Sequence, residues 1–391
     1  MNSILSILII FEKKIEMKKI LFALILSFSF INANSQIVEE YGGGYVSDNT
    51  VLDKIDIEEV GRSIHVASVE DGKLRVRRFY RGKWEEFDQT PIEGIFKLKA
   101  LEIFAYKAVP YVFCYYDDKM SVIRAIDDKW EFVGEEDFGT GNVTNPEFSV
   151  IGEEPYILFE DKDYEMIRMF SLLDETWYDV DVMPIEGVKS YKLAANFRGD
   201  LYMAVMDAEG ILIKEVDQLI EDMNEWKDLT KKIKLEDIAR IDDFEFIENK
   251  AYITYSTTTG PVIISLEDLA KKWETIEDAA DAEAPFELGK ANYNLNISEY
   301  YFFTSLSSTG IPQYLKNNKR GVWGAVNNLS DKKAKSLASC EYRNIIYTAY
   351  VDNATGKLMV KKIEKGELED EKKAVVPTND DKKDDKKKKK K

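Results

Sequence analysis

Acidic residues recur at one position of this chain, directly after a short apolar segment. Carboxylates gathered on a common face could hold a Ca²⁺ ion or meet a cationic partner. Asp is also an ordinary hairpin-turn residue, so solvated turns are the alternative, and none of these segments matches an EF-hand loop. No other cofactor is predicted. The candidate ligand-binding residues, all at this position, are Asp71, Asp117, Asp118, Asp161, Asp207 and Asp352.

Basic residues recur on the segment that follows these acidic turns. Such a set could form a carboxylate-binding cluster, but its members lie at different distances from the next Trp and do not obviously converge. Ion pairing with the acidic turns is therefore the prediction, and exposed pairs of that kind add little stability. The residues are Arg77, Arg78, Arg124, Arg168, Lys214, Lys361 and Lys362.

Nucleophilic catalysis has little support in this sequence. His65 is the only histidine and lies inside an apolar segment, which predicts a packing role. Cys114 and Cys340 are far apart in the repeat order, so they are predicted to be buried free thiols rather than a disulfide framework. Zinc-type His/Cys clusters are missing from the sequence. Paired carboxylates for glycoside hydrolysis stay open, because 72 acidic residues supply many pairs. No catalytic residue is predicted.

Six tryptophans mark a repeat, with spacings of 46, 47, 49, 47 and 50 residues. Regularly placed aromatic side chains could stack on sugars. Packing between repeated units requires the same pattern, and burying about 200 Å² per Trp stabilises the fold by up to about 5 kcal/mol. Packing is the prediction. The residues are Trp84, Trp130, Trp177, Trp226, Trp273 and Trp323.

Each Trp begins the last strand of a unit of about four strands. Residues 110–134 illustrate three of them, separated by acidic turns at 117–119 and 127–129. A seventh unit has Leu368 at the Trp position. Four strands per roughly 47 residues are typical of a β-propeller blade, so the sequence predicts an all-β chain with a single β-propeller of seven four-stranded blades, or six if the last unit is a cap.

Three segments depart from this regular pattern. Residues 37–50, which include Gly42, are predicted to add a strand that helps to close the ring. Residues 216–226 and 265–273 have helix-like apolar spacing and are predicted to carry short helices between the third and fourth strands of their units.

A family resemblance rests on the Pro-Tyr strands that begin at Pro110 and Pro155, the Asp/Gly turns, the strand that begins at Ser121 and the anchoring Trp. Together they resemble the degenerate repeats of secreted bacterial β-propeller proteins, a group adjacent to the sialidase-like and lectin-like propellers. The resemblance implies a fold more strongly than a function. The kelch double glycine, the WD dipeptide and the sialidase Asp-box are missing from the sequence.

The ends of the chain differ from its body. Residues 1–36 are predicted to be a signal peptide with a functional start at Met17, because two lysines precede the apolar run 20–31 and small residues follow it. We expect export to the periplasm, the cell surface or the medium, with no transmembrane segment in the mature chain. The propeller is assigned to residues 37–376. Residues 377–391 form a predicted disordered tail of Lys and Asp that could contact anionic envelope polymers.

The predicted body is strongly acidic. Residues 37–376 hold 42 Lys plus Arg and 66 Asp plus Glu, a net charge of −24. Such a surface repels nucleic acid. The sequence predicts a non-enzymatic binding or scaffolding module that presents one face to a protein or glycan partner. The alternatives are a glycan-active hydrolase or lyase with acidic residues at the central channel, and a purely structural envelope component. An enzyme should show an axial pocket with converging carboxyl or tyrosine side chains and shifted carboxyl pKa values, whereas a binder needs only a shallow face.

Overall fold

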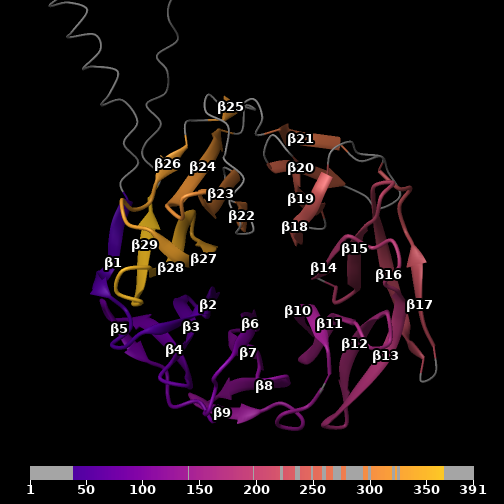
Figure 1. The fold of residues 1–391 in the computed structure, drawn as a ribbon, viewed down its shortest axis with the longest axis horizontal. Coiled ribbons are helices and arrows are strands. Elements are labelled where there is room, and N and C mark those ends of the chain that lie inside the picture. Colours follow the sequence, from indigo (N-terminus) through magenta and orange to yellow (C-terminus); the bar gives the residue numbers. More distant parts are fainter. Residues whose placement is uncertain are drawn as a thin grey trace, which may run out of the picture. The chain divides into compact units, whose positions relative to one another are not determined.

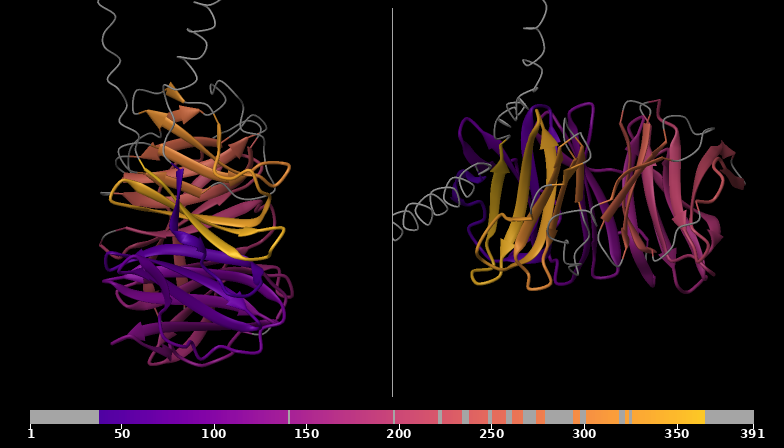
Figure 2. Two further views of the ribbon diagram at one scale, coloured as in Figure 1. Left: turned by 90° about the vertical axis from the view of Figure 1, so that its left-hand side faces the viewer. Right: turned by 90° about the horizontal axis from the view of Figure 1, so that it is seen from above.

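The computed structural model describes residues 38–364, apart from 140, 197, 221–222, 234–237, 248–249, 258–260, 267–273, 279–293, 298–300, 319–321 and 324–325. Every regular element within these residues is a β-strand. The strands form seven sheets around a common axis, a seven-bladed β-propeller (Figure 1). The prediction of seven blades rather than six is therefore confirmed. Figure 2 shows that the strands run roughly along the axis of the ring.

Each blade is an antiparallel meander whose first strand lies nearest the axis (Figure 1). Blade 1 consists of β2 (Val51–Val60), β3 (Ser63–Glu70), β4 (Lys73–Tyr80) and β5 (Lys83–Glu86). Blade 2 consists of β6 (Leu98–Tyr106), β7 (Val109–Tyr116), β8 (Lys119–Ile126) and β9 (Lys129–Phe132). Blade 3 consists of β10 (Val143–Ile151), β11 (Glu154–Asp161), β12 (Met166–Leu173) and β13 (Thr176–Pro184).

The second half of the ring repeats this order. Blade 4 consists of β14 (Ser190–Ala195), β15 (Leu201–Met206), β16 (Ile211–Ile220) and β17 (Met223–Asp228). Blade 5 consists of β18 (Ile238–Ile247), β19 (Lys250–Thr257), β20 (Pro261–Leu266) and β21 (Glu274–Asp278). Blade 6 consists of β22 (Asn294–Ile297), β23 (Tyr301–Leu306), β24 (Pro312–Asn318) and β25 (Val322–Trp323), with the short β26 (Asn327–Asn328) also paired to β24.

Blade 7 is assembled from both ends of the described chain. Three of its strands are β27 (Ala334–Tyr342), β28 (Ile345–Asp352) and β29 (Leu358–Ile363). Its fourth strand is β1 (Val38–Tyr45), which pairs antiparallel with β29. The predicted closing strand at the start of the propeller is thus confirmed. The fourth-strand role predicted for the segment at Leu368 belongs to β1 in this structure, and Leu368 itself lies outside the described residues.

The hairpins follow from the sequence at their tips. β7 is buried at both parities, as its uninterrupted apolar run predicts. Asp117 and Asp118, which join β7 to β8, both have positive φ, of 44° and 65°. Positive φ at both central residues defines the type I′ turn, whose twist matches the twist of the flanking strands. Asp tolerates this left-handed conformation better than most residues, which explains the acidic tips in conformational terms.

The hydrophobic core lies between consecutive blades. One cluster joins blades 2 and 3 through side chains such as Phe113, Phe148 and Phe159, all less than 8% exposed. The anchoring tryptophans belong to the same interfaces, and Trp177 stacks on Phe138 at a centroid distance of 4.2 Å. Packing between blades is therefore confirmed for the tryptophan of blade 3. Trp273 lies outside the described residues.

One secondary-structure prediction is wrong. A short helix is predicted for residues 216–226, but the described residues 216–220 and 223–226 belong to the paired strands β16 and β17, with Val216 opposite Trp226. Apolar residues three and four positions apart are compatible with either structure, and pairing of β16 with its neighbours on both sides decides between them. Most of the second segment with helix-like spacing, 267–273, lies outside the described residues.

Candidate functional site

A cavity of about 1010 Å³ lies at the axis of the ring. Its wall comes from the first strands of blades 1 to 5 and of blade 7, and the turn after β23 completes it. The lining residues occupy the starts of these first strands. In the antiparallel pairing, Val51 at the start of β2 lies opposite Glu70, and Leu98 at the start of β6 lies opposite Tyr116. The cavity therefore opens on the face that carries the acidic turns.

Carboxylates on the first strands tie neighbouring blades together around this cavity. The backbone N–H of Ile103 donates to Asp56 Oδ2 at 2.8 Å, which joins blade 2 to blade 1. The N–H of Phe148 donates to Glu102 Oε2 at 3.1 Å, which joins blade 3 to blade 2. These N–H groups belong to the innermost strands, which have no further strand to pair with on the axial side. The carboxylates satisfy donors that would otherwise depend on water.

Blades 3 and 4 are joined by an ion pair instead of a hydrogen bond from a backbone N–H group. Lys192 Nζ on β14 lies 2.7 Å from Glu147 Oε1 on β10. Burial acts to lower the pKa of Lys192, but the carboxylates of Glu147, Glu102 and Asp243 raise it overall. The ammonium thus stays protonated, which argues against a role for Lys192 as an amine nucleophile.

Several carboxyl groups on the first strands have raised pKa values, chiefly because burial disfavours their charged form. The pKa of Asp56 rises to about 7 and that of Asp243 to about 6. The pKa of Glu58 rises to about 8 through burial and the nearby charges of Asp56 and Glu59. Burial and the Glu147 charge raise the pKa of Glu102 well above its ordinary value.

Glu245 contributes a further unusual carboxyl group. Its Oε1 atom is buried and has no hydrogen-bond partner. Burial and the charges of Asp243 and Glu58 raise the pKa of this side chain well above its ordinary value. The first strands thus carry several carboxyl groups whose charged form is disfavoured by burial.

None of the six residues predicted from the acidic turns lines the cavity. Asp117 accepts hydrogen bonds from the backbone N–H groups of Phe96 and Lys97, at 2.9 and 3.1 Å, and so fixes the connection into blade 2. Asp118 forms an ion pair with Lys99, and the Lys99 side chain does line the cavity.

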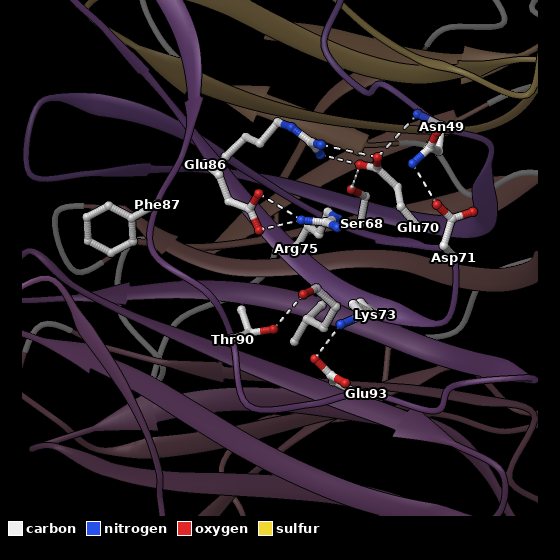
Figure 3. Close-up of polar contacts among 12 residues, drawn as sticks. Asn49, Ser68, Glu70, Asp71, Lys73, Arg75, Glu86, Phe87, Thr90 and Glu93 are labelled. Atoms are coloured by element: carbon white, nitrogen blue, oxygen red, sulfur yellow. Dashed lines mark hydrogen bonds and ion pairs between the residues drawn. The ribbon is translucent and has the colours of Figure 1, made fainter.

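The equivalent turn of blade 1 contains a compact polar network (Figure 3). Glu70 is fully buried and forms an ion pair with Arg77, whose side chain is 7% exposed. Ser68 donates to the same carboxylate at 3.4 Å. Asp71 accepts a 2.6 Å hydrogen bond from the side-chain amide of Asn49, which links the turn to the connection between blades 7 and 1. The network holds the turn in place.

Three further predicted residues make similar local contacts. Asp161 is 7% exposed and accepts from the backbone N–H of Asp163 at 3.0 Å. Asp207 accepts from the N–H of Glu209 at 2.7 Å. Asp352 is 1% exposed and accepts from the Tyr45 hydroxyl at 3.1 Å, which joins β1 to the end of β28.

The basic residues of the third strands find two kinds of partner. Arg77 and Arg168 pair with Glu70 and Asp161, at the end of the second strand, as predicted. Four of the remaining five pair across to the fourth strand instead, where Arg168 also pairs with Asp179 and Asp181. The four pairs are Arg78 with Glu85, Arg124 with Glu131, Lys214 with Asp228 and Lys362 with Glu39.

The candidate nucleophiles are packing residues. His65 is 3% exposed, lies edge-on to Phe87, and has its pKa lowered to about 4 by burial. Cys114 and Cys340 are buried free thiols, as predicted, and burial raises the pKa of both. Among the described residues, no group of three or more His, Cys, Asp or Glu side chains is arranged to hold a metal ion. No helix in this part of the chain is long and apolar enough to cross a membrane.

The residues that sequence reasoning missed are the polar side chains of the first strands. Their signal was present: Lys54, Asp56 and Glu58 alternate along β2, and Asp243 and Glu245 do the same on β18. Alternate residues of a strand face the same side. Polar residues at alternate positions of the innermost strand of a blade therefore indicate a solvent-filled cavity at the axis.

Several solved propellers resemble this fold. The BP39L lectin from Burkholderia pseudomallei matches with a TM-score of 0.55 and 14% identity, over 82% of this chain and 97% of that one. The polysaccharide lyase Uly1 matches with a TM-score of 0.49 and 9% identity, over 82% and 91%. A sialidase from Trypanosoma rangeli matches with a TM-score of 0.44 and 12% identity, over 73% and 56%. Identities this low show the β-propeller fold alone. No family model and no curated protein matches the chain.

Proposed function

We propose that this chain is a non-enzymatic binding module that holds a glycan in the axial cavity. The cavity itself carries the proposal. Its volume, about 1010 Å³, is at the upper end of the usual range for small-molecule sites, and charged or polar side chains form most of its wall. Sugar hydroxyl groups need such a mixture of hydrogen-bond donors and acceptors. The lectin among the similar propellers is consistent with this ligand class, and the predicted export would bring the protein to extracellular glycans.

The channel carboxylates support binding rather than catalysis. Asp56 and Glu102 accept hydrogen bonds from the next blade, and Glu147 is paired with Lys192. Carboxylates engaged in joining strands are poorly placed to exchange protons with a substrate. Their role is to keep the wall of the cavity rigid, so that a ligand meets preorganised groups.

A binding assay that compares the two faces of the ring tests this proposal. The mature chain, residues 37–391, is applied to a glycan array, and any ligand found is then titrated against two variants. Ser308→Trp places a bulky side chain at an exposed position in the cavity wall. Asp127→Trp places the same side chain on the opposite face, in the turn between β8 and β9. We expect at least tenfold weaker binding for Ser308→Trp alone. Equal losses, or no glycan bound by the parent chain, would contradict the proposal.

A glycan-active hydrolase or lyase is the second candidate, and one specific observation favours it. The axial cavity does bring carboxyl groups with raised pKa values together, which is the feature expected of an enzyme. Incubating the protein with the bound glycan and measuring chain ends or unsaturated products separates the two candidates. An enzyme should release products, and Glu102→Gln should stop their release while binding persists.

A further inference from the structure

Basic side chains line the mouth of the axial cavity on five of the seven blades. They are Lys54 on blade 1, Lys99 on blade 2, Lys189 before blade 4, Arg240 on blade 5 and Lys335 on blade 7. We name these five residues the basic ring. The same wall also carries Lys192, which is paired with Glu147, and seven carboxyl side chains, those of Asp53, Asp56, Glu102, Glu147, Glu160, Asp242 and Asp243.

The backbone presents three of these side chains in the same way. The pairing of the first strand with its neighbour is interrupted where Lys54, Lys99 and Lys335 lie, between Val51 and Ile55, Leu98 and Ala100, and Ala334 and Leu337. A bulge releases a residue from the ladder and re-aims its side chain, and bulges are common beside binding sites. The repeated interruption therefore turns these three residues toward the mouth.

Part of the basic ring has no charged partner. Lys54 and Lys189 are exposed, and within the described part of the chain neither forms an ion pair. Lys335 lies 3.7 Å from Asp53 Oδ1 and both side chains keep exposure to solvent. Lys99 and Arg240 are paired, with Asp118 and Asp242. At least two ammonium groups are thus available to an incoming anion.

We propose that the basic ring selects an acidic glycan, a saccharide that carries carboxylate or sulfate groups. This inference rests on the proposed glycan-binding function and specifies its ligand class. Lysine ammonium groups bind such anions as point charges, and Arg240 adds a planar donor group that matches their oxygens. The uncharged hydroxyl groups of the same saccharide would reach the polar wall below the ring.

The channel carboxyl groups are compatible with an anionic ligand. Asp56 and Glu102 lie below the ring, and burial raises the pKa of both, to about 7 for Asp56 and well above the ordinary value for Glu102. Because burial disfavours the charged form of both groups, they repel an anionic ligand less than ordinary carboxylates would.

The acidic remainder of the protein restricts the kind of anion. A long polyanion lying across the outer surface would meet net negative charge and be repelled. A short oligosaccharide, or the end of a chain inserted along the axis, meets the basic ring first. The inferred ligand is therefore an acidic chain end.

Titration calorimetry on the mature chain with three oligosaccharides of equal length tests the inference. One is neutral, one contains uronate and one carries sulfate. We expect the neutral sugar to bind at least tenfold more weakly than one or both acidic ones, and the preferred acidic sugar identifies the source of the charge. The double variant Lys54→Gln/Lys189→Gln should lose at least tenfold in affinity for that sugar, with a smaller dependence of binding on salt.

The matched control is Lys83→Gln/Lys129→Gln, which removes the same charge from two exposed lysines at the hairpins of the opposite face. It should bind like the parent chain, and melting temperatures should show that all variants are folded. Equal binding of neutral and acidic sugars, or equal effects of the two double variants, overturns the acidic-glycan inference and leaves glycan binding intact. No binding of any sugar overturns both.

Discussion

The indole nitrogen of Trp130 donates a 2.7 Å hydrogen bond to the backbone carbonyl of Phe87 in the preceding blade. The same bond recurs from Trp84 to Tyr41 at 2.8 Å and from Trp177 to Val133 at 3.2 Å. Each tryptophan thus packs at its own blade interface and also marks the register of that blade against its neighbour. Trp226 departs from the pattern, because its indole nitrogen is buried without a hydrogen-bond partner.

Trp130→Phe should lower the free energy of unfolding by about 1–3 kcal/mol, because it removes the indole donor, leaves the Phe87 carbonyl unpaired and opens a small void. Trp226→Phe removes a donor that has no partner, so it should cost about 1 kcal/mol less. Urea denaturation of both variants measures the difference. Equal losses would show that the hydrogen bond contributes nothing beyond packing. Trp130→Ala should cost about 3–5 kcal/mol.

Gly42→Ala should destabilise the closure of the ring. A Cβ atom at this position would lie 2.5 Å from Trp84 Cδ1, and the backbone has a φ of +89°. Gly43 has a φ of +74° but no atom within 4 Å of a built Cβ, so Gly43→Ala carries the backbone strain without the clash. We expect about 1 kcal/mol of destabilisation for Gly43→Ala and a further 1–3 kcal/mol, roughly, for Gly42→Ala. Matching melting temperatures for the two variants would contradict the contact with Trp84.

Glu58→Gln should change how stability depends on pH. The pKa of Glu58 is about 8 in the folded protein, against an ordinary value of 4.5. Between these two pKa values the folded state holds a proton that the unfolded chain has lost. The contribution of Glu58 to the free energy of unfolding is therefore fully present below about pH 4.5 and is lost as the pH rises through 8. Glutamine does not titrate, so the variant lacks this pH dependence. Its free energy of unfolding minus that of the parent should be about 1–3 kcal/mol larger at pH 8.5 than at pH 5. Exposed Glu136→Gln is the control and should leave the profile unchanged.

Arg77→Met should be strongly destabilising, by about 3–5 kcal/mol, because it leaves the fully buried Glu70 carboxylate without its counter-ion. Lys73 forms a 2.6 Å ion pair with Glu93, and both of these side chains are about half exposed. Lys73→Met should cost less than about 1 kcal/mol. Chemical denaturation of both variants makes the comparison. Equal losses from the two variants would contradict the role of Arg77 as the counter-ion of Glu70.

Repetition made the architecture predictable. Trp84 and its five counterparts gave the period, and the apolar runs gave the strand positions, because each blade solves the same packing problem with the same residue types. Asp117 and Asp118 were predicted to lie in a turn between two strands, and the structure places them there with positive φ. A closing strand within residues 37–50 was also predicted, although the fourth strand of the last unit was assigned to the segment at Leu368 rather than to Val38–Tyr45.

The axial cavity could not be predicted in the same way. Its wall depends on which residues of the first strands face the axis, and local bulges such as the one near Lys99 shift that alternation by one position. The pairing of Lys192 with Glu147 joins residues 45 positions apart, and no local pattern distinguishes them from other charged residues. The helix expected at 216–226 failed because its apolar spacing also suits a hairpin, and strand pairing was not visible in the sequence.

The fourth strand of blade 7 has a consequence for the order in which the molecule can assemble. β1 is the first strand of the described chain to be synthesised, yet its partner β29 is the last. Six blades can form locally as the chain emerges, but the final one requires a contact between segments more than 300 residues apart, as in the pairing of Val38 with Ile363. Such a long loop closure is slow. The ring therefore closes late in folding. Until it does, the seventh blade exposes an unpaired strand edge to solvent and to other chains.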